Sequence, residues 1–562
     1  MPLEMPNDAQ GRLAATLEKA STDFVDEKAS IHTLPLEVLH DVFSYIRTTS
    51  QVTPSHLHTS HLVRPTKAAH TPWIVLLAVC SRWRNFICST AEYWRCIHLY
   101  SPRPDWLKLC LSRAKLAGPC LDVYFHGINV HWSLLGVLLE NSQHIRTLSH
   151  DEMGDGWPDA LREFLSSDPL LRVLSISGRK PRLSFDVSSC ANLRSLVLHN
   201  VVPVMGLSLY TQLEHLELSV APWMSDWSHL HKALSACTKL VTLSLRSCLS
   251  HLVTTFPPSI QPTISLPRLR SLHLEHPAGN THQWLLSFIH LPRIKHVHIT
   301  ENLTRANRAG ISCSFSSILP TAPIQQSLSA IFPFVRDAVA IELSTLNPSF
   351  YTFKSFLCAP NDTTTDHPCA LVLTLKRELE FHGFDRRLPA LPTSARCLHD
   401  VAYMLPGANI TTAHLSVALE DTTSADFAGF LRSFPHLLEL RLAGEGSFRP
   451  ALEALMSSQA HDDARTTPFC PKLRHLVLGA PCKFTPGLLI TLGNVLRWRK
   501  GRGAPLHAVK LNLTLAHKPA FQSVQEQFAP SLEAEVLGSV AWVFVVDFDG
   551  LPRPRDRVWG ML

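Results

Sequence analysis

One phrase with the pattern L-x-x-L-x-L recurs along most of the chain, and it constrains the fold more than any other feature. Clear copies run from Leu171 to Ile176 and from Leu269 to Leu274. Other copies begin at Leu193, Leu213, Leu240, Ile294, Leu437 and Leu473, and weaker ones at Ile145, Ala338, Ala370, Ile410 and Ala508. Alternate residues of a strand point to the same face. Each phrase therefore predicts a short strand whose leucines enter a core.

The spacing of the phrases predicts how these strands are assembled. Their central residues stand at 148, 174, 196, 216, 243, 272 and 297, which are 20 to 29 residues apart, and the later steps are longer. Intervening segments such as 227–237 and 427–434 have the apolar spacing of helices. This pattern resembles a leucine-rich repeat, in which single units cannot bury their apolar side and stack on their neighbours. The resemblance implies an α/β fold, an irregular solenoid with parallel strands inside and helices outside over residues 140–520, followed by a cap at 521–562.

The N-terminal region has a different, helical periodicity. Residues 1–30 are polar, and we expect them to be flexible. Apolar residues then recur at helical spacing from Pro35 to Ile46, and again from Trp73 to about Thr90. Residues 47–72 between them are rich in Thr, Ser, Pro and His, which predicts a surface loop.

These helices also carry a recognisable motif. Leu34-Pro35-x-Glu37, the following Val38, Val42 and Phe43, then Val79-Cys80-x-Arg82-Trp83 and a closing Trp94 resemble the F-box over residues 31–99, with connecting helices at 100–139. The inserted stretch 47–72 departs from the usual pattern of that family. The resemblance implies docking to a Skp-type adaptor protein and, through it, to a cullin. The residues it assigns to this contact are Leu34, Pro35, Val38, Leu39, Val42, Phe43, Val79, Cys80 and Trp83. The alternative is that they form only the core of a small helical domain.

Basic residues share one position of the repeated phrase. Arg146, Arg172, Arg194, Arg270, Lys295 and Arg474 each follow the first apolar residue of their copy. Strands stacked in register would align them into a basic stripe, and guanidinium groups suit carboxylate or phosphate ligands. The stripe hypothesis predicts that the concave face binds an acidic or phosphorylated segment of a target protein. The alternative is that these are ordinary solvated strand residues.

Composition excludes several classes of protein. With 45% hydrophobic and 17% charged residues, the chain of 562 residues is expected to fold rather than stay disordered. A net charge of +6 is small for a nucleic-acid binder of this length. The 14 cysteines are scattered, which favours a reducing compartment. Without an apolar signal core or a long apolar run, we expect a cytoplasmic or nuclear protein with no membrane partner.

No motif points to catalysis, a metal or a cofactor. His56, His58, His61 and His70 crowd one loop without acidic or thiol partners, so metal binding there is not expected. The segment 547–550 resembles only a fragment of a calcium loop. Basic residues at 497, 499, 500 and 502 fit a nuclear-import signal weakly and a solvated helix end better.

The sequence thus predicts a non-catalytic substrate-recognition subunit of a Skp-cullin-F-box type ubiquitin ligase, which would bring a target protein close to the conjugating enzyme. A second hypothesis is a cullin-independent F-box scaffold for protein interactions, and a third is an enzyme with an atypical site. Recognition of the target protein would depend on irregular surface side chains of the repeats.

Overall fold

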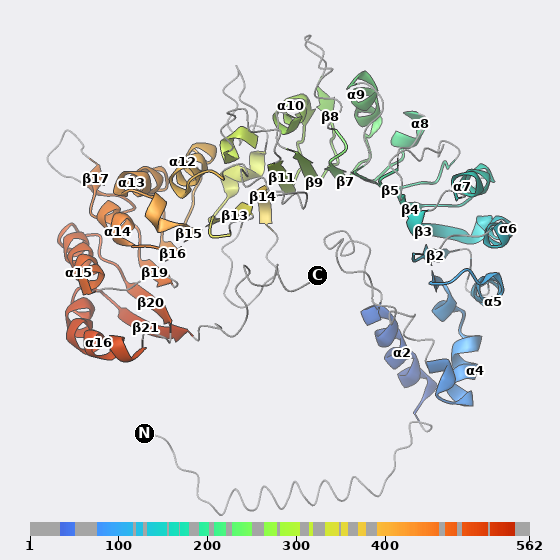
Figure 1. Cartoon of the computed structure of the whole chain (residues 1–562), viewed down its shortest axis with the longest axis horizontal. Coiled ribbons are helices and arrows are strands. Elements are labelled where there is room, and N and C mark those ends of the chain that lie inside the picture. Colours follow the sequence, from blue (N-terminus) through green and yellow to red (C-terminus); the bar gives the residue numbers. More distant parts are fainter. Residues whose placement is uncertain are drawn as a thin grey trace, which may run out of the picture. The chain divides into compact units, whose positions relative to one another are not determined.

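The recurring leucine phrases form β-strands in which leucines of the core alternate with residues on the opposite face. A computed structural model of the chain (Figure 1) separates into two compact units, Met1–Leu174 and Ser175–Leu562. Strand β4, Val173–Gly178, contains the boundary. The structure describes residues 34–50, 76–115, 118, 120–127, 132–153, 157–167, 169–178, 190–201, 207–220, 227–249, 263–277, 281–303, 314–318, 332–347, 350–357, 369–377, 391–459, 467–479, 486–514 and 518–545.

The first unit begins with the predicted helical segment. Helix α2, Leu36–Ser50, is followed by α4, Ser81–Ser89, and by the 3-10 helix η3, Ala91–Trp94. Helix α2 continues into the stretch predicted as a loop, because no glycine or proline interrupts the sequence before Pro54. The cluster of histidines at 56–70 and the N-terminal residues 1–33 lie outside the described residues.

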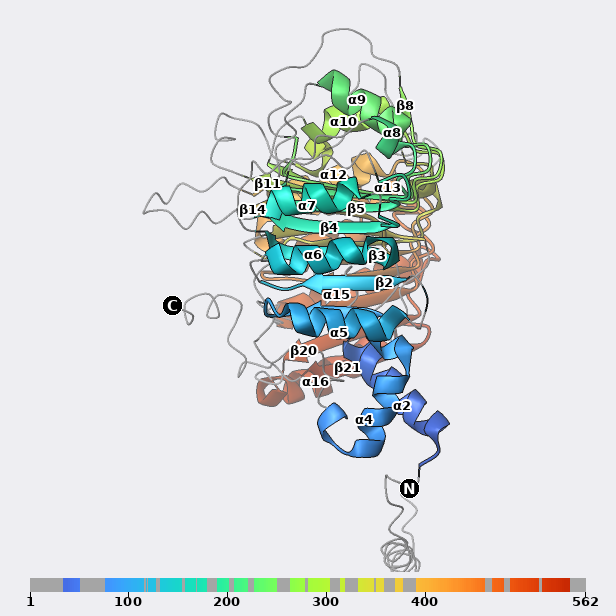
Figure 2. The ribbon, with the colours of Figure 1, turned by 90° about the vertical axis from the view of Figure 1, so that its right-hand side faces the viewer.

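The first unit also contains two strands that the sequence did not reveal, next to a third that begins at the phrase predicted at Ile145. Strand β1, Cys96–Leu99, pairs in parallel with β2, Leu121–Phe125, which pairs in parallel with β3, Ile145–Met153. The region 100–139 was expected to hold only connecting helices, and β2 corrects this. Its buried residues alternate with half-buried ones without forming the leucine phrase, so it escaped a search for that phrase. Figure 2 shows the helices of this unit running alongside the strands; they are α5, Pro104–Ala114, α6, Trp132–Glu140, and α7, Trp157–Ser166, with η5, Ser142–His144, after α6.

The second unit starts as a regular parallel sheet. Its first strands pair in the order β5–β6–β7–β9–β11, each parallel to the next. They are β5, Ser195–His199, β6, His215–Ser219, β7, Thr242–Arg246, β9, Ser271–Pro277, and β11, His296–Leu303. The intervening helices are α8, Leu207–Tyr210, α9, Trp227–Ala236, and α10, Thr281–Phe288; β8, Ile264–Ser265, pairs with β10, Ile289–His290. The helix predicted at 227–237 is confirmed as α9.

The middle of this unit departs from the parallel order. Strands β12, Ala340–Ser344, β13, Phe350–Phe356, and β14, Cys369–Arg377, form an antiparallel meander. Because β14 pairs with β11 and β12 pairs with β15, these three strands lie in reverse of their order in the chain. No helix lies between β12 and β13 in the described residues, and only a crossover connection could have kept them parallel. The phrases at Ala338 and Ala370 are therefore strands, but not successive parallel repeats.

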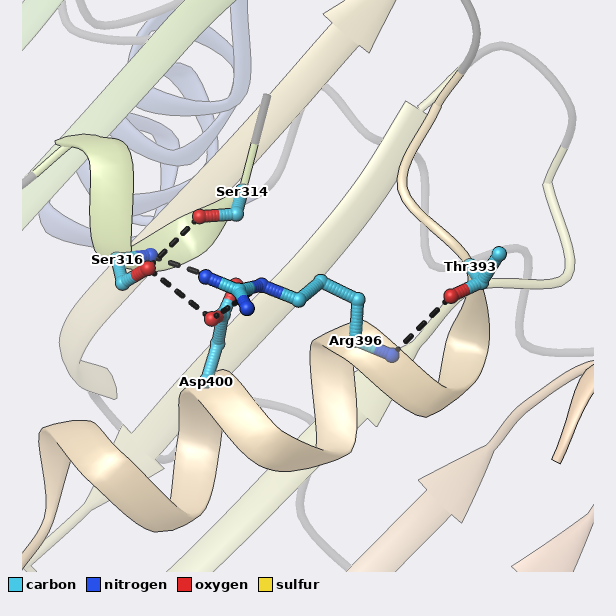
Figure 3. A network of polar contacts seen from close by, with 5 residues as sticks. All are labelled: Ser314, Ser316, Thr393, Arg396 and Asp400. Carbon is cyan, nitrogen blue, oxygen red and sulfur yellow. Dashed lines mark hydrogen bonds and ion pairs between the residues drawn. The ribbon is translucent and has the colours of Figure 1, made fainter. Parts of the chain in front are cut away.

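A buried carboxylate fastens the irregular segment that leads into this meander (Figure 3). Asp400 of α12, Ser394–Met404, is 1% exposed. Its Oδ1 accepts a hydrogen bond from the Ser316 hydroxyl at 3.0 Å and faces Arg396 Nε at 3.2 Å. Ser316 belongs to the 3-10 helix η8, Phe315–Ile318, which is thereby held against α12. A second 3-10 helix, η9, Pro333–Asp337, precedes β12.

The C-terminal half of the second unit returns to regular parallel pairing. Strands pair in the order β15–β16–β19–β20–β21, and Figure 1 shows α12 to α16 on one side of them. We call the opposite side, which no described helix covers, the open face. The predicted cap at 521–562 is corrected in part, because β21 continues the same sheet. The elements are β15, Thr412–Ser416, η10, Leu419–Asp421, α13, Ser424–Ser433, β16, Glu439–Ala443, α14, Arg449–Leu455, β17, Ser458–Gln459, β18, Thr467–Pro468, β19, His475–Gly479, α15, Pro486–Gly501, β20, Ala508–Thr514, α16, Lys518–Glu533, and β21, Ser539–Val545.

The basic group near residue 500 serves the fold. Arg499 is fully buried, and its guanidinium donates to the carbonyl oxygens of Phe469 at 3.1 Å and Cys470 at 2.9 Å. Lys500 donates to the Ala534 carbonyl at 2.7 Å. These contacts place the group at the end of α15, as the helix-end interpretation expects, but Arg499 is buried rather than solvated, which corrects that part of the prediction. The segment 547–550 lies outside the described residues.

Candidate functional site

Helix α2 begins directly after Pro35, whose carbonyl accepts the Leu39 N–H at 3.1 Å. Its inner face carries Phe43, which is fully buried and packs edge-on against Trp83 with ring centroids 4.8 Å apart. The Arg82 guanidinium, just before Trp83, donates to the Leu34 carbonyl at 2.7 Å and so ties α4 to the start of α2. The two helices therefore share one apolar core.

The outer face of α2 leaves large apolar side chains in solvent. Val38, Val42 and Tyr45 are 41%, 42% and 70% exposed. Successive helical residues turn by about 100°, so side chains spaced four and three residues apart lie on one face. We call Val38, Val42 and Tyr45 the docking face. Leu36 is 48% exposed but lies roughly on the opposite side of the helix.

The residues predicted to contact an adaptor divide into two groups. Pro35, Val38, Val42 and Val79 are exposed, and Leu34 and Cys80 are half-buried. Leu39, Phe43 and Trp83 are at most 6% exposed, and for them the prediction of direct contact is corrected because they form the core between the helices. Cys80 caps α4, since its sulfur accepts the Trp83 N–H at 3.4 Å. The sequence reading missed Tyr45, although its spacing from Val38 and Val42 was visible.

The basic residues of the repeated phrase do align in register, but other residues interrupt them. Backbone hydrogen bonds join the corresponding residues of neighbouring repeats, from the Arg172 N–H to the Arg146 carbonyl in the first unit and from the Lys295 N–H to the Arg270 carbonyl in the second. Between Arg194 and Arg270, the same ladder contains Glu214 and Val241. Arg474 lies between Leu438 and His507. The sequence therefore aligns basic pairs rather than the continuous stripe of the hypothesis.

On strands β6 to β11, polar side chains on the face opposite the buried leucines contact one another. The Arg246 guanidinium lies 3.6 Å from a Glu217 carboxylate oxygen and 3.4 Å from His273 Nδ1. The rings of His273 and His298 stack with centroids 4.5 Å apart. Burial, then His298 and Arg246, lowers the pKa of His273 to about 3, so this imidazole is neutral at physiological pH. These groups largely satisfy each other.

The open face of β15 to β21 contains a groove with a volume of about 660 Å³. Its floor includes Ala443 and Gly479, which are register partners on β16 and β19. A Cβ added to Gly479 would meet the Ala443 methyl at 3.5 Å, which is an ordinary contact. The floor of the groove is therefore open because its side chains are small. The groove is open here because small residues, Ala443 and Gly479, occupy paired positions on the open face of these strands.

Cationic side chains predominate around this groove. Arg441 and Lys510 line it together with one carboxylate, Glu439, which Arg441 Nε contacts at 2.6 Å. Lys510 is exposed, and no described carboxylate is recorded in an ion pair with it. His414 also lines the groove, and burial is the main cause that lowers its pKa. Strand β19 lies between the strands of Arg441 and Lys510, so two interstrand spacings put their backbones about 10 Å apart. The groove can therefore hold an extended chain segment that carries negative charge.

Comparison with known proteins does not identify the chain. No protein-family model matches it, and a search of curated proteins finds no relative. Within the described ranges, no group of three or more His, Cys, Asp or Glu side chains could hold a metal ion. No helix among the described residues is both long and apolar enough to cross a membrane.

Proposed function

We propose that this protein is the substrate-recognition subunit of a Skp-cullin-F-box type ubiquitin ligase. In this proposal the helices α2 and α4 belong to an F-box, and the strands of the second unit form an irregular leucine-rich-repeat solenoid that holds a target protein. The chain performs no chemistry itself. It raises the effective concentration of the target's lysines near a charged conjugating enzyme.

The docking face is the observation that carries the proposal. Three large apolar side chains exposed on one side of a helix cost free energy in water, and exposed apolar patches typically mark protein interaction sites. Phe43 and Trp83 hold α2 from its other side, so the face is presented on a rigid support. An apolar partner surface of the kind that a Skp-type adaptor offers would bury it.

The groove supports the second half of the proposal, the capture of a target. Small residues at Ala443 and Gly479 admit a main chain close to the sheet, while Lys510 and Arg441 attract carboxylate or phosphate groups. We infer that the target presents an extended acidic segment to this groove. The stripe hypothesis also predicted an acidic ligand, but the residues that we now expect to bind it are those of the groove.

A pull-down with matched charge substitutions tests the adaptor contact. Val42→Glu should lower the affinity for a Skp-type adaptor about a hundredfold, because it places a charge in an apolar interface. Leu36→Glu is the control, since Leu36 is equally exposed on the same helix but outside the docking face. Equal adaptor binding by the two variants would refute the docking face. Recovery of a cullin with the adaptor supports the ligase, whereas adaptor without cullin supports the scaffold alternative.

The groove requires a separate test. An acidic peptide should bind the full-length protein, more weakly as salt increases, and Lys510→Glu should abolish this binding. Lys472→Glu is the control, because Lys472 is exposed but does not line the groove. If both variants bind the peptide like the unaltered protein, the target does not use this groove. Replacing Gly479 by Leu gives a second readout, because it fills the floor without altering charge.

A further inference from the structure

Four side chains on the first unit's sheet form a continuous chain of contacts. Cys96 Sγ lies 3.2 Å from His98 Nε2, and His98 Nδ1 lies 3.0 Å from His126 Nε2. His126 Nδ1 lies 2.7 Å from a carboxylate oxygen of Asp151. Cys96 and His98 belong to β1, His126 directly follows β2, and Asp151 belongs to β3. Parallel pairing of the three strands thus joins a thiol to a carboxylate through two imidazoles.

The carboxylate determines the direction of every hydrogen bond in this chain. An ionised Asp151 can only accept, so His126 Nδ1 carries a hydrogen and donates it. A neutral His126 then accepts at Nε2, which makes His98 Nδ1 the donor. His98 Nε2 is left as an acceptor, and the group within its reach is the Cys96 thiol. We call these four residues the thiol relay.

Neighbouring rings hold the relay in place. His98 stacks on Tyr124 at 4.8 Å and His126 stacks on Tyr100 at 4.6 Å, both with nearly parallel planes. The backbone N–H of His126 donates to the Leu99 carbonyl at 2.9 Å. The side chain of His126 is only 14% exposed, whereas that of Asp151 is 45% exposed. The imidazoles are therefore pre-oriented, and Asp151 remains open to solvent.

We propose that Cys96 is a covalent modification site for soft electrophiles, activated by the thiol relay. When the sulfur attacks, its proton passes to His98 Nε2 while the His98 Nδ1 proton passes to His126 Nε2. The charge then rests on an imidazolium beside the Asp151 carboxylate, and His98 is neutral again in its other tautomer. With iodoacetamide, an S–C bond forms, the C–I bond breaks, iodide leaves, and His126 releases the proton to water.

This route agrees with the electrostatics of the two imidazoles. Burial, then His126, lowers the pKa of His98 to about 4, so a lasting positive charge on His98 is unfavourable. His98 therefore passes the proton on, and the imidazolium forms where a carboxylate contacts it. The thiolate, not the thiol, is the nucleophile of cysteine, so removal of this proton is what raises reactivity.

Most other described thiols lack such activation. Burial raises the pKa of Cys110, Cys237, Cys248 and Cys470 to about 12, which keeps them protonated. Cys80 is half-buried like Cys96, and its sulfur accepts the Trp83 backbone N–H at the start of α4, a position that favours a thiolate, but among the described residues it has no imidazole contact that could take its proton. Cys80 is therefore an internal reference of similar exposure.

The test is the rate of iodoacetamide alkylation at each cysteine of the full-length protein, followed by mass spectrometry. At pH 7, Cys96 should react at least about tenfold faster than Cys80, and Asp151→Asn should slow Cys96 about tenfold without affecting Cys80. The comparison with Cys80 in the unaltered protein needs no variant. Alkylation of Cys96 no faster than that of Cys80 would overturn the proposal.

A pH profile separates activation by Asp151 from a merely structural effect. The difference in the alkylation rate of Cys96 between the unaltered protein and Asp151→Asn should disappear near pH 10, where the Cys96 thiol would be ionised in both proteins without help from a base. Other groups on these strands do not supply such a change. The pKa values of Tyr100 and Tyr124 are raised, mainly by burial, and Asp122 is paired with Arg146 at 2.6 Å. A constant difference at every pH would contradict the relay.

Discussion

A buried pair of histidines should make the second unit sensitive to acid. His276 of β9 and His282 of α10 are each 1% exposed, and their rings meet edge to face with centroids 5.3 Å apart. Burial lowers the pKa of His282 to about 4, which the backbone of Thr300 opposes only in part. Burial, then His282, holds the pKa of His276 well below its ordinary value.

The sign and size of the effect follow from the difference between folded and unfolded chains. An unfolded histidine has a pKa of about 6.5. Between pH 6.5 and about pH 4, His282 is therefore protonated in the unfolded chain but neutral in the folded chain. Stability from this residue is therefore complete above pH 6.5 and is lost as the pH falls toward 4. For His282 alone, the loss between pH 7 and pH 5 is about 2 kcal/mol.

Urea unfolding at pH 7 and pH 5, followed by circular dichroism, measures this loss. His282→Leu places an apolar side chain in the buried site and removes the titrating group. Between pH 7 and pH 5, the free energy of unfolding of this variant should therefore fall by about 2 kcal/mol less than that of the unaltered protein. His507→Leu, at an exposed position, is the control and should behave like the unaltered protein. Equal losses for His282→Leu and the unaltered protein would refute the reasoning.

Three substitutions test packing and backbone conformation, each by urea or thermal unfolding. Phe43→Ala should destabilise the helical segment by about 3–5 kcal/mol, because it leaves a cavity against Trp83; a loss under about 1 kcal/mol would contradict the core assignment. Asp400→Ala should cost about 1–3 kcal/mol, since the half-buried Ser316 hydroxyl loses its acceptor and Arg396 loses its ion-pair partner, and an unchanged unfolding midpoint would contradict the role of Asp400 in holding η8. Val220 has a φ of +63°, which a β-branched residue tolerates poorly, so Val220→Gly should stabilise the protein by about 1 kcal/mol rather than destabilise it.

Periodicity alone was sufficient to place most of the secondary structure. The leucine phrases predicted strands, because alternation along a strand is a local property that does not depend on which neighbour pairs with it. Helices at 227–237 and 427–434 were predicted on the same ground and correspond to α9 and α13. Strands β1 and β2 were missed because they do not carry the leucine phrase, although β2 alternates buried and half-buried residues as the predicted strands do.

The sequence could not decide which apolar residues of α2 face a partner. Val38, Leu39, Val42 and Phe43 all fit the helical spacing, yet one pair is exposed and the other is buried. The choice was made by Trp83, some distance along the chain, which covers Phe43 and leaves Val42 in water.

By itself, then, the sequence determined that this chain builds repeated strands and helices behind a short helical segment that resembles a docking module. Only the tertiary structure decided the reversed order of β12 to β14, the small-residue groove and the thiol relay. Each of these depends on the strand register, which brings together residues that no local pattern links. Pairing energies between strands and the burial of side chains set that register, and both are properties of the assembled sheet rather than of any one segment.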